Sequence, residues 1–244
     1  MMLILDWRQP LPPAQPPVCQ PPTKLLTALE ARAPLDWLSV LLYSPHLIFA
    51  RRGNGAPVML VPGYMTSELS MRPLKLFLNK IGHNAHDWKL GRNRGNVRQD
   101  VERVSLILSE LYEHYEQPVS LVGWSLGGVI SRELARLHPE KVKQVITMGT
   151  PISGGPKYTF FGNNFKRNDN LDIDQIEREI HERNLLGITQ PITSIYSKSD
   201  GIVGWKASLD RYNPQADNIE VFSSHLGLGI NGKVWRIIAD KLAS

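Results

Sequence analysis

The chain has 244 residues, 42% of them hydrophobic and 21% charged, and one soluble globular domain with a full core is its simplest organisation. The net charge of +5 is spread without a block of like charges, which argues against a nucleic-acid-binding protein. No apolar run reaches the roughly 18 residues of a spanning helix, and the first residues lack the basic region of a secretory signal. With a single cysteine, Cys19, which cannot form an internal disulfide, we expect a cytoplasmic protein.

The first 22 residues are rich in proline, with seven prolines between residues 10 and 22. This density predicts an extended N-terminal arm with little role in chemistry. From Thr23 onward, leucines recur at helical spacing and give the segment one apolar face. We expect that face to pack on the protein's own domain or to roof its pocket. Contact with a membrane surface stays open as the alternative.

After the N-terminal segment, strand patterns alternate with helix patterns. The expected strands are residues 47–52, 57–62, 83–87, 118–124, 142–148, 191–197 and 219–222, and the expected helices are residues 70–80, 97–116, 126–138, 173–180 and 233–242. This alternation predicts an α/β fold over residues 23–244, with a doubly wound, mostly parallel sheet and helices on both faces. Residues 152–190 interrupt the rhythm and are expected to form a small lid insertion.

The sequence GWSLG at residues 123–127 closes a β-branched run and leads into a helical pattern. This arrangement is typical of a nucleophile elbow, in which small residues flank a serine that is held in a strained turn. The turn places the Ser125 hydroxyl near the N-terminus of the following helix, where backbone N–H groups stabilise an oxyanion. The alternative is a glycine-rich turn whose serine only caps the helix. We interpret Ser125 as the nucleophile.

A serine nucleophile needs a base, and the base needs a group that orients it. Asp200 and His225 each follow an expected strand, so both are predicted to lie at the carboxyl edge of the parallel sheet, where working groups gather. The chain order of serine, aspartate and histidine is that of the α/β-hydrolase arrangement. By position, Asp87 is the leading alternative to Asp200 as the acid.

An oxyanion hole requires two N–H donors, one of them on the residue after the nucleophile. That residue is Leu126. The second donor is expected from the loop after the strand at residues 57–62, with Tyr64 as the first choice and Met65 as the second. Gly63 permits the close backbone approach that this loop needs.

Four aromatic residues are candidates for substrate binding because they lie in or beside the expected site. They are Trp88, Trp124, Phe160 and Phe161, the last two within the expected lid. The segment that holds Arg92, Asn93 and Arg94 follows a strand end and has the side chains to bind a polar group of a substrate. A glycine-rich loop held by its own hydrogen bonds is the favoured interpretation of that segment.

Several of these motifs together resemble the lipase and esterase branch of the α/β-hydrolase superfamily, over about residues 55–243. They are the sequences VPGY at 61–64, GWSLGG at 123–128, GTP at 149–151, DGIV at 200–203 and SHLG at 224–227. The resemblance implies a catalytic triad of Ser125, Asp200 and His225 and no cofactor. The chain departs from the family where lipases commonly carry His-Gly in place of Pro62-Gly63, and at its start, where the first strands of the full fold are reduced or absent.

The sequence therefore predicts a serine hydrolase that cleaves a small carboxylic ester, with an acyl or lipid-like part, through an acyl-enzyme. An acyltransferase with the same triad stays open, as does a non-catalytic binding protein, although no triad member is missing. Dehalogenase chemistry is disfavoured because it needs a carboxylate where Ser125 stands. No metal is expected, because no clustered ligand spacing such as H-E-x-x-H is present.

Overall fold

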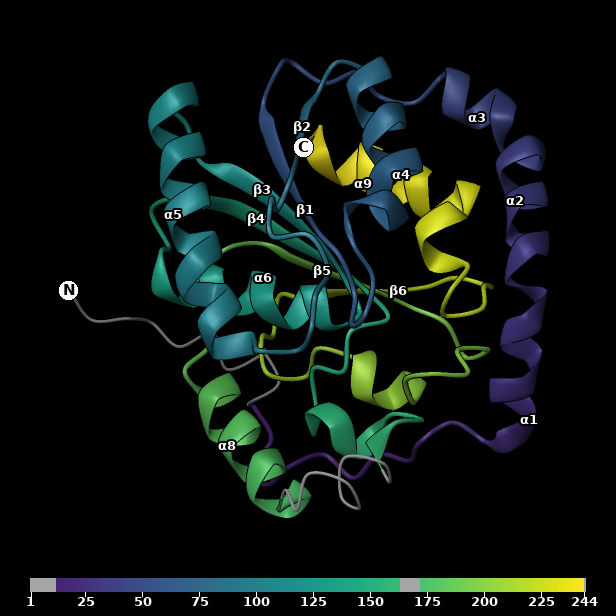
Figure 1. Cartoon of the computed structure of the whole chain (residues 1–244), viewed down its shortest axis with the longest axis vertical. Helices are drawn as coiled ribbons and strands as arrows, with labels where there is room; N and C mark the ends of the chain where they lie inside the picture. The colour runs from purple at the N-terminus through teal and green to yellow at the C-terminus, as the bar shows by residue number, and fades with distance from the viewer. Residues whose placement is uncertain (1–11, 163–171, 244) are drawn as a thin grey trace.

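Six parallel strands form the centre of the molecule in the computed structural model, which describes residues 12–162 and 172–243 (Figure 1). The strands are β1 (Pro57–Val61), β2 (Asn84–Asp87), β3 (Val119–Trp124), β4 (Val142–Met148), β5 (Ile192–Tyr196) and β6 (Asp217–Glu220). Their order across the sheet is β2-β1-β3-β4-β5-β6. The chain therefore reverses its winding direction between β1 and β3. Ligands of open parallel sheets bind at the carboxyl ends of the strands at such a switch point.

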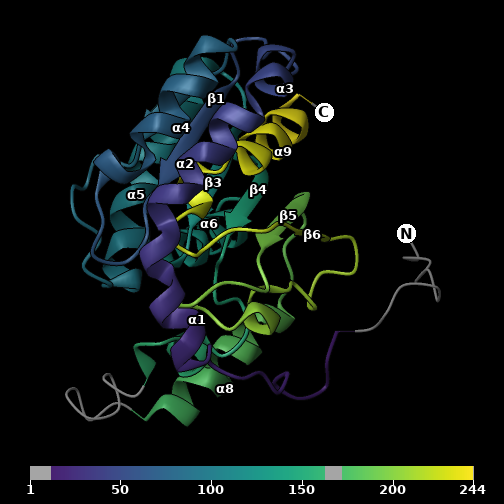
Figure 2. The ribbon, with the colours of Figure 1, turned by 90° about the vertical axis from the view of Figure 1, so that its right-hand side faces the viewer.

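Helices cover both faces of this sheet (Figures 1 and 2). They are α1 (Lys24–Ala28), α2 (Ala33–Leu42), α3 (Ser44–Ile48), α4 (Glu68–Lys80), α5 (Val97–Tyr115), α6 (Leu126–Leu137), α8 (Ile173–Leu185) and α9 (Gly232–Leu242). Helices α4 and α9 share one hydrophobic core with the sheet, and α5 and α6 share the other. The predicted doubly wound parallel sheet is confirmed.

Strand β1 shows why the sheet is buried on both faces. Val58 and Leu60 pack into the core beneath α4 and α9, while Met59 and Val61 pack into the core beneath α5 and α6. All four side chains are at most 1% exposed. Successive strand residues point to opposite faces, so a strand covered on both sides must be apolar throughout.

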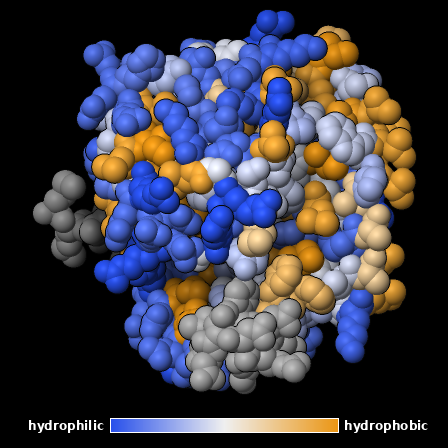
Figure 3. Space-filling model, viewed as in Figure 1, coloured by the Kyte–Doolittle hydropathy of each residue, from blue (hydrophilic) through white to orange (hydrophobic). Residues whose placement is uncertain are grey.

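Helices α2 and α3 pack against the outside of α9, and α1 to α3 form one edge of the molecule (Figures 1 and 2). Apolar atoms are prominent along this edge in the space-filling view (Figure 3). The part of the proline-rich arm that the structure describes is also packed. Cys19 is 5% exposed and lies in a small cluster with Tyr158, Val203 and Ala207.

The strand expected over residues 47–52 was wrong. Residues 44–48 form helix α3, and residues 50–56 have no regular secondary structure. Leu47 and Ala50 of the apolar run reach the core, while Ile48 and Phe49 between them are 76% and 79% exposed. A short apolar run fits a helix as well as a strand, and here it continues the helical segment before it.

None of the helices within residues 12–162 and 172–243 has both the length and the apolar character needed to cross a membrane.

Candidate active site

Ser125 lies at the tight turn between β3 and α6, at the switch point of the sheet. Its backbone has φ 53° and ψ −121°, an unfavourable conformation for a residue with a side chain. Its N–H donates to the Met148 carbonyl at 2.8 Å, and its own carbonyl accepts from the Thr150 hydroxyl at 2.9 Å. These bonds fix the turn from the neighbouring strand β4.

The flanking glycines permit close backbone approaches around this turn. A Cβ on Gly127 would lie 2.1 Å from the Val61 carbonyl oxygen, and one on Gly123 would lie 2.4 Å from the Cα of Gly128. No larger residue fits at either position without moving the backbone. The small residues of the motif thus have the packing role that the elbow pattern assigns to them.

His225 and Asp200 are brought together from the loops after β6 and β5. The His225 Nδ1 and Asp200 Oδ2 atoms are 2.7 Å apart, and the two side chains are 5% and 1% exposed. The other carboxylate oxygen of Asp200 accepts the N–H groups of Ile202 and Val203 at 2.9 and 2.7 Å. The carboxylate is therefore fixed and holds the proton of the imidazole on Nδ1, which leaves Nε2 as the basic nitrogen.

Electrostatics around His225 favour its protonated form. Burial by itself lowers the pKa of the imidazole, but the charge of Asp200, the hydrogen bond to it and the charge of Glu30 outweigh burial and raise the pKa above its ordinary value. A raised pKa suits a group that must accept a proton and later return it.

Asp87, the alternative acid, lies elsewhere. Its carboxylate forms an ion pair with Lys75 of α4 at the end of β2, and both side chains are partly exposed. Asp200, not Asp87, therefore stands against His225.

The loop after β1 lies against the elbow. A Cβ on Gly63 would come within 3.2 Å of the Ser125 Cβ, so the loop passes directly beside the serine. The Met65 N–H donates to the Asn93 carbonyl at 2.7 Å. This bond occupies the Met65 donor, and Met65 is therefore not suited to the oxyanion role. Tyr64, the first choice from the sequence, lies in the same loop, and Leu126 is the first residue of α6.

Asn93 holds the loop after β2 to the loop after β1. Its side chain is fully buried, donates from Nδ2 to the Pro62 carbonyl at 2.9 Å and accepts from the Gly95 N–H at 3.1 Å. The neighbouring Arg92 and Arg94 are exposed. Asn93 therefore supports the backbone near the site, as the favoured interpretation of this loop expected.

Of the four aromatic candidates for substrate binding, Trp88 does not lie on a surface that a substrate could reach. It is fully buried in the core beneath α5 and α6, and its indole N–H donates to the Gly91 carbonyl at 3.0 Å. Trp88 therefore packs the interior and does not face a substrate. Trp124 is 6% exposed, and its ring centroid lies 6.2 Å from that of His225, so it covers one side of the imidazole.

Phe160 and Phe161 form an aromatic group with Tyr64. The Phe161 ring centroid is 6.1 Å from that of Tyr64 and 5.3 Å from that of Phe160, which is 48% exposed. The described beginning of the expected lid therefore reaches the loop that passes beside Ser125.

Two site-supporting residues had not been predicted from the sequence. Glu30 and Asp36, from the N-terminal helices, accept hydrogen bonds from the loops that carry Asp200 and His225. A signal was available, because they are the only two acidic residues between Thr23 and Arg52. Buried carboxylates in an apolar segment need partners, but the sequence does not name those partners.

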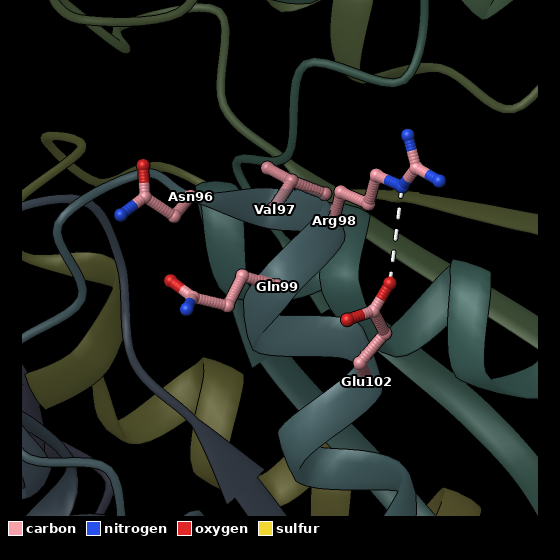
Figure 4. Close-up of a pocket in the computed structure, with 5 residues that line it drawn as sticks. All are labelled: Asn96, Val97, Arg98, Gln99 and Glu102. Carbon is pink, nitrogen blue, oxygen red and sulfur yellow. Dashed lines mark ion pairs between the residues drawn. The ribbon is translucent and has the colours of Figure 1, made fainter.

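An open hollow of the surface lies at the start of α5 (Figure 4). It is lined by Asn96, Val97, Arg98, Gln99 and Glu102, and Arg98 is paired with Glu102 across one helical turn. None of these five lining residues is buried. Within the residues that the structure describes, no group of three or more histidine, cysteine, aspartate or glutamate side chains is placed to hold a metal ion.

Comparison with known proteins agrees with this fold. The family model described as "alpha/beta hydrolase fold" matches residues 113–169. Over 53 residues the chain is 40% identical to the pimeloyl-[acyl-carrier protein] methyl ester esterase of Chromobacterium violaceum, and over 31 residues it is 55% identical to the biotin biosynthesis bifunctional protein BioHC of Teredinibacter turnerae. These matches cover 22% and 13% of the chain but only 20% and 5% of the two relatives.

Solved structures match over much more of the chain. The thioesterase domain from the curacin biosynthetic pathway has a TM-score of 0.58 at 15% identity, covering 80% of this chain and 93% of that one. The lipase BlEst2 of Bacillus licheniformis has a TM-score of 0.59 at 16% identity, covering 80% and 94%. The monoacylglycerol lipase of Paleococcus ferrophilus has a TM-score of 0.54 at 17% identity, covering 78% and 96%. With its switch point, its elbow and these matches, the chain has the α/β-hydrolase fold.

Proposed function

We propose that the protein is a serine hydrolase that cleaves carboxylic esters through an acyl-enzyme, with Ser125, His225 and Asp200 as its triad. The observation that carries the proposal is the buried His225–Asp200 pair, held at 2.7 Å on the same edge of the sheet as the strained turn of Ser125. A histidine that a buried carboxylate orients is the base that a serine nucleophile requires.

In the proposed reaction, His225 Nε2 takes the proton of the Ser125 hydroxyl while the oxygen attacks the ester carbonyl. The imidazolium then gives that proton to the leaving alcohol, and the acyl group stays on the serine. Water attacks this acyl-enzyme with His225 again as the base, and the acid is released. Asp200 stays ionised throughout and stabilises the imidazolium.

The backbone N–H groups of Leu126 and Tyr64 are proposed to stabilise the negative charge that develops on the carbonyl oxygen. Leu126 begins α6, and the first N–H groups of a helix have no acceptor within the helix. The Tyr64 backbone belongs to the loop that lies against the Ser125 Cβ. Preorganised donors of this kind contribute about 100- to 1000-fold each to the rate.

The aromatic group of Tyr64, Phe160 and Phe161 supports an acyl or lipid-like substrate. These rings lie beside the proposed oxyanion loop, and Phe160 remains 48% exposed. Exposed aromatic surface beside the loop that passes Ser125 is suited to an apolar chain attached to an ester. The lipases and the thioesterase domain that share the fold are consistent with such a substrate.

The test is a series of p-nitrophenyl esters, from acetate to palmitate, measured on the wild type and on Ser125→Ala. We expect the wild type to hydrolyse the esters and Ser125→Ala to lose activity by about 10⁶-fold. Ser44→Ala, a change at an exposed serine of α3, is the control and should leave the rate unchanged. Hydrolysis that persists in Ser125→Ala would exclude Ser125 as the nucleophile.

A further inference from the structure

Glu30 lies in the helical turn between α1 and α2, and its carboxylate bridges the loops of Asp200 and His225. Its Oε1 accepts the N–H of Gly201 at 2.7 Å and the N–H of His225 at 2.8 Å. Its Oε2 accepts the N–H of Leu226 at 3.0 Å. The residue is 6% exposed, so water does not replace these bonds easily. One side chain thus accepts hydrogen bonds from three backbone N–H groups on two loops. The residues that pair across these loops, Asp200 and His225, are 25 residues apart in the sequence.

The rest of the N-terminal helical segment holds the same loops. The Thr27 hydroxyl donates to the Gly201 carbonyl at 2.7 Å, and the Asp36 carboxylate accepts from the Ser224 hydroxyl at 2.8 Å. A Cβ on Gly201 would lie 2.2 Å from the Leu26 carbonyl oxygen. The backbone of the helical segment is therefore in direct contact with the Asp200 loop, and this contact fixes the position of Glu30.

We propose that Glu30 is a positioning residue for the His225–Asp200 pair: it fixes the backbone of His225 against the Asp200 loop and adds a second negative charge near His225. The groups around the ring are the carboxylates of Asp200 and Glu30 and the indole of Trp124. Both carboxylates raise the pKa of His225. Only the expected effect of Glu30 on the reaction rate rests on the proposed ester hydrolysis.

The experiment compares Glu30→Gln with the wild type by nuclear magnetic resonance of the His225 imidazole, titrated against pH without substrate. The glutamine keeps the size but removes the charge and one acceptor. We expect a lower pKa of His225 and, in ester hydrolysis, a kcat/KM reduced about 10- to 100-fold through misplacement of the imidazole. The acidic limb of the pH profile should move to lower pH, because His225 then loses its proton more readily. Glu113→Gln, the same charge change at an exposed position of α5, should alter neither quantity.

A second variant, Glu30→Asp, keeps the charge but shortens the bridge by one methylene. It should leave the pKa of His225 near the wild-type value and still lower kcat, and it decides the question if Glu30→Gln does not fold. A folded Glu30→Gln with an unchanged pKa of His225, or Glu30→Asp with an unchanged kcat, would overturn the role of Glu30. Loss of the proposed hydrolase function would appear instead as a wild type without esterase activity, and the titration would remain interpretable.

A separate observation concerns the outward side of the same helices. Nine large apolar side chains of α1 to α3 and their connections are at least 40% exposed, and we call them the apolar face (Figure 3). They are Leu25, Leu29, Leu35, Trp37, Leu38, Leu41, Leu42, Ile48 and Phe49. Such a continuous group is larger than the scattered apolar residues of an ordinary surface, and it indicates an interaction site.

Within residues 23–52, the exposed charged side chains are of one sign. The two acids between Thr23 and Arg52 are turned inward, with Glu30 buried and Asp36 bonded to the His225 loop. The exposed charges of this stretch are Lys24 at its start and Arg51 and Arg52 at its end. If a second copy of the chain packed its own apolar face on this one, the cations of the two copies would lie opposite one another in a parallel or an antiparallel arrangement. Residues 23–52 offer no exposed acid to pair with them.

We infer that the apolar face binds the surface of an anionic lipid bilayer, with the apolar side chains in the interface and the cations against the head groups. Interfacial helices combine these two features, an apolar face and flanking positive charge. The polar side of the segment is already used by the loops of Asp200 and His225, so binding would bring those loops close to the lipid surface. This inference does not depend on the proposed reaction.

Co-sedimentation with vesicles tests the lipid surface directly. The wild type should bind vesicles of phosphatidylcholine mixed with phosphatidylglycerol, bind less at high salt, and bind weakly to phosphatidylcholine alone. Leu41→Glu combined with Leu42→Glu should weaken binding about 10- to 100-fold. Leu106→Glu on α5 is the matched control, since Leu106 and Leu41 are both 69% exposed. Equal binding by the double variant and the control would contradict the proposal. So would a dimer in light scattering that Leu41→Glu dissociates, because a second copy would then occupy the face.

Discussion

Gly149 shows how closely the backbone is fitted around the proposed catalytic pair. It follows β4 with φ 55°, and a Cβ there would lie 2.9 Å from His225 Nδ1 and 3.0 Å from Asp200 Oδ2. The His225–Asp200 pair therefore rests on a position where only glycine leaves room. Together with the strained Ser125, this residue makes the carboxyl edge of the sheet intolerant of small changes.

We predict that Gly149→Ala reduces kcat/KM for ester hydrolysis by about 100-fold or more, because the added methyl group displaces the imidazole or the carboxylate. Gly91→Ala is the matched control. Its φ is 70°, but no atom lies within 4 Å of the added Cβ, so only the backbone penalty of about 1 kcal/mol applies. Steady-state kinetics and thermal unfolding of both variants separate the two effects, and equal kinetic losses in both would contradict this prediction.

The pH profile is a second prediction at the residue scale. His225 must be neutral to take the serine proton, and its raised pKa means that kcat/KM should rise with pH around a midpoint above the ordinary histidine value of about 6.5. Asp200→Asn removes the larger of the two carboxylate effects and the correct tautomer, so kcat/KM should fall by about 10⁴-fold. A profile that is flat from acidic to neutral pH would exclude His225 as the base.

At the scale of elements, the described part of the expected lid is fastened to the body of the domain. The Asn184 side chain of α8 donates to the Ile152 carbonyl at 2.8 Å, and Arg183 pairs with Glu133 of α6 at 2.9 Å. Farther along α8, the His181 Nδ1 and Tyr212 hydroxyl oxygen atoms are 3.1 Å apart. Helix α8 therefore behaves as part of the fold's framework.

We predict that Asn184→Ala lowers the free energy of unfolding by about 1–3 kcal/mol, because it leaves the buried Ile152 carbonyl without this donor. Arg178→Ala is the control on the same helix. Its side chain is 60% exposed and forms only a 4.0 Å surface pair with Asp172, so its effect should be below about 1 kcal/mol. Urea denaturation measures both, and similar stabilities would mean that α8 is not held by Asn184.

At the scale of the whole molecule, the N-terminal segment closes the carboxyl edge of the sheet from outside. Residues of the arm reach the loop after β5, where a Cβ on Gly204 would lie 1.9 Å from the Gln20 carbonyl oxygen. Helices α1 and α2 then cover the loops of Asp200 and His225. The proline-rich arm, expected to have little role in chemistry, thus packs beside the Asp200 loop, and the helical segment after it supports the proposed site.

Cys19 reports whether the arm is docked. Burial raises the pKa of its thiol, and the residue is 5% exposed, so we predict that a disulfide reagent modifies it very slowly in the native protein. Modification should become fast in urea, at the concentration where the fold is lost. A fast reaction in the native protein, with the fold intact by circular dichroism, would show that the arm leaves its site on the body of the domain.

The sequence by itself determined the features that depend on local pattern. Alternating strand and helix periodicities predicted the doubly wound sheet, which the structure confirms, and the glycines around Ser125 predicted the tight turn at 123–127. Such patterns are local because burial on a strand or a helix face repeats along the chain. The order of Ser125, Asp200 and His225 could be read in the same way, because each follows a strand. Their role as a triad stays a prediction.

Only the tertiary structure decided what lies beside these local features. The hydrogen bonds of Glu30 join it to Gly201 and His225, which are 171 and 195 residues away along the chain. No periodicity carries that information. Trp88 follows a strand end as a substrate-binding residue would, yet packing buries it, and the apolar run at 47–49 fits a helix or a strand equally well until its neighbours are known. Contacts with residues distant in the sequence determine which of several locally possible conformations a segment adopts, because burial and hydrogen bonding are satisfied only in the assembled fold.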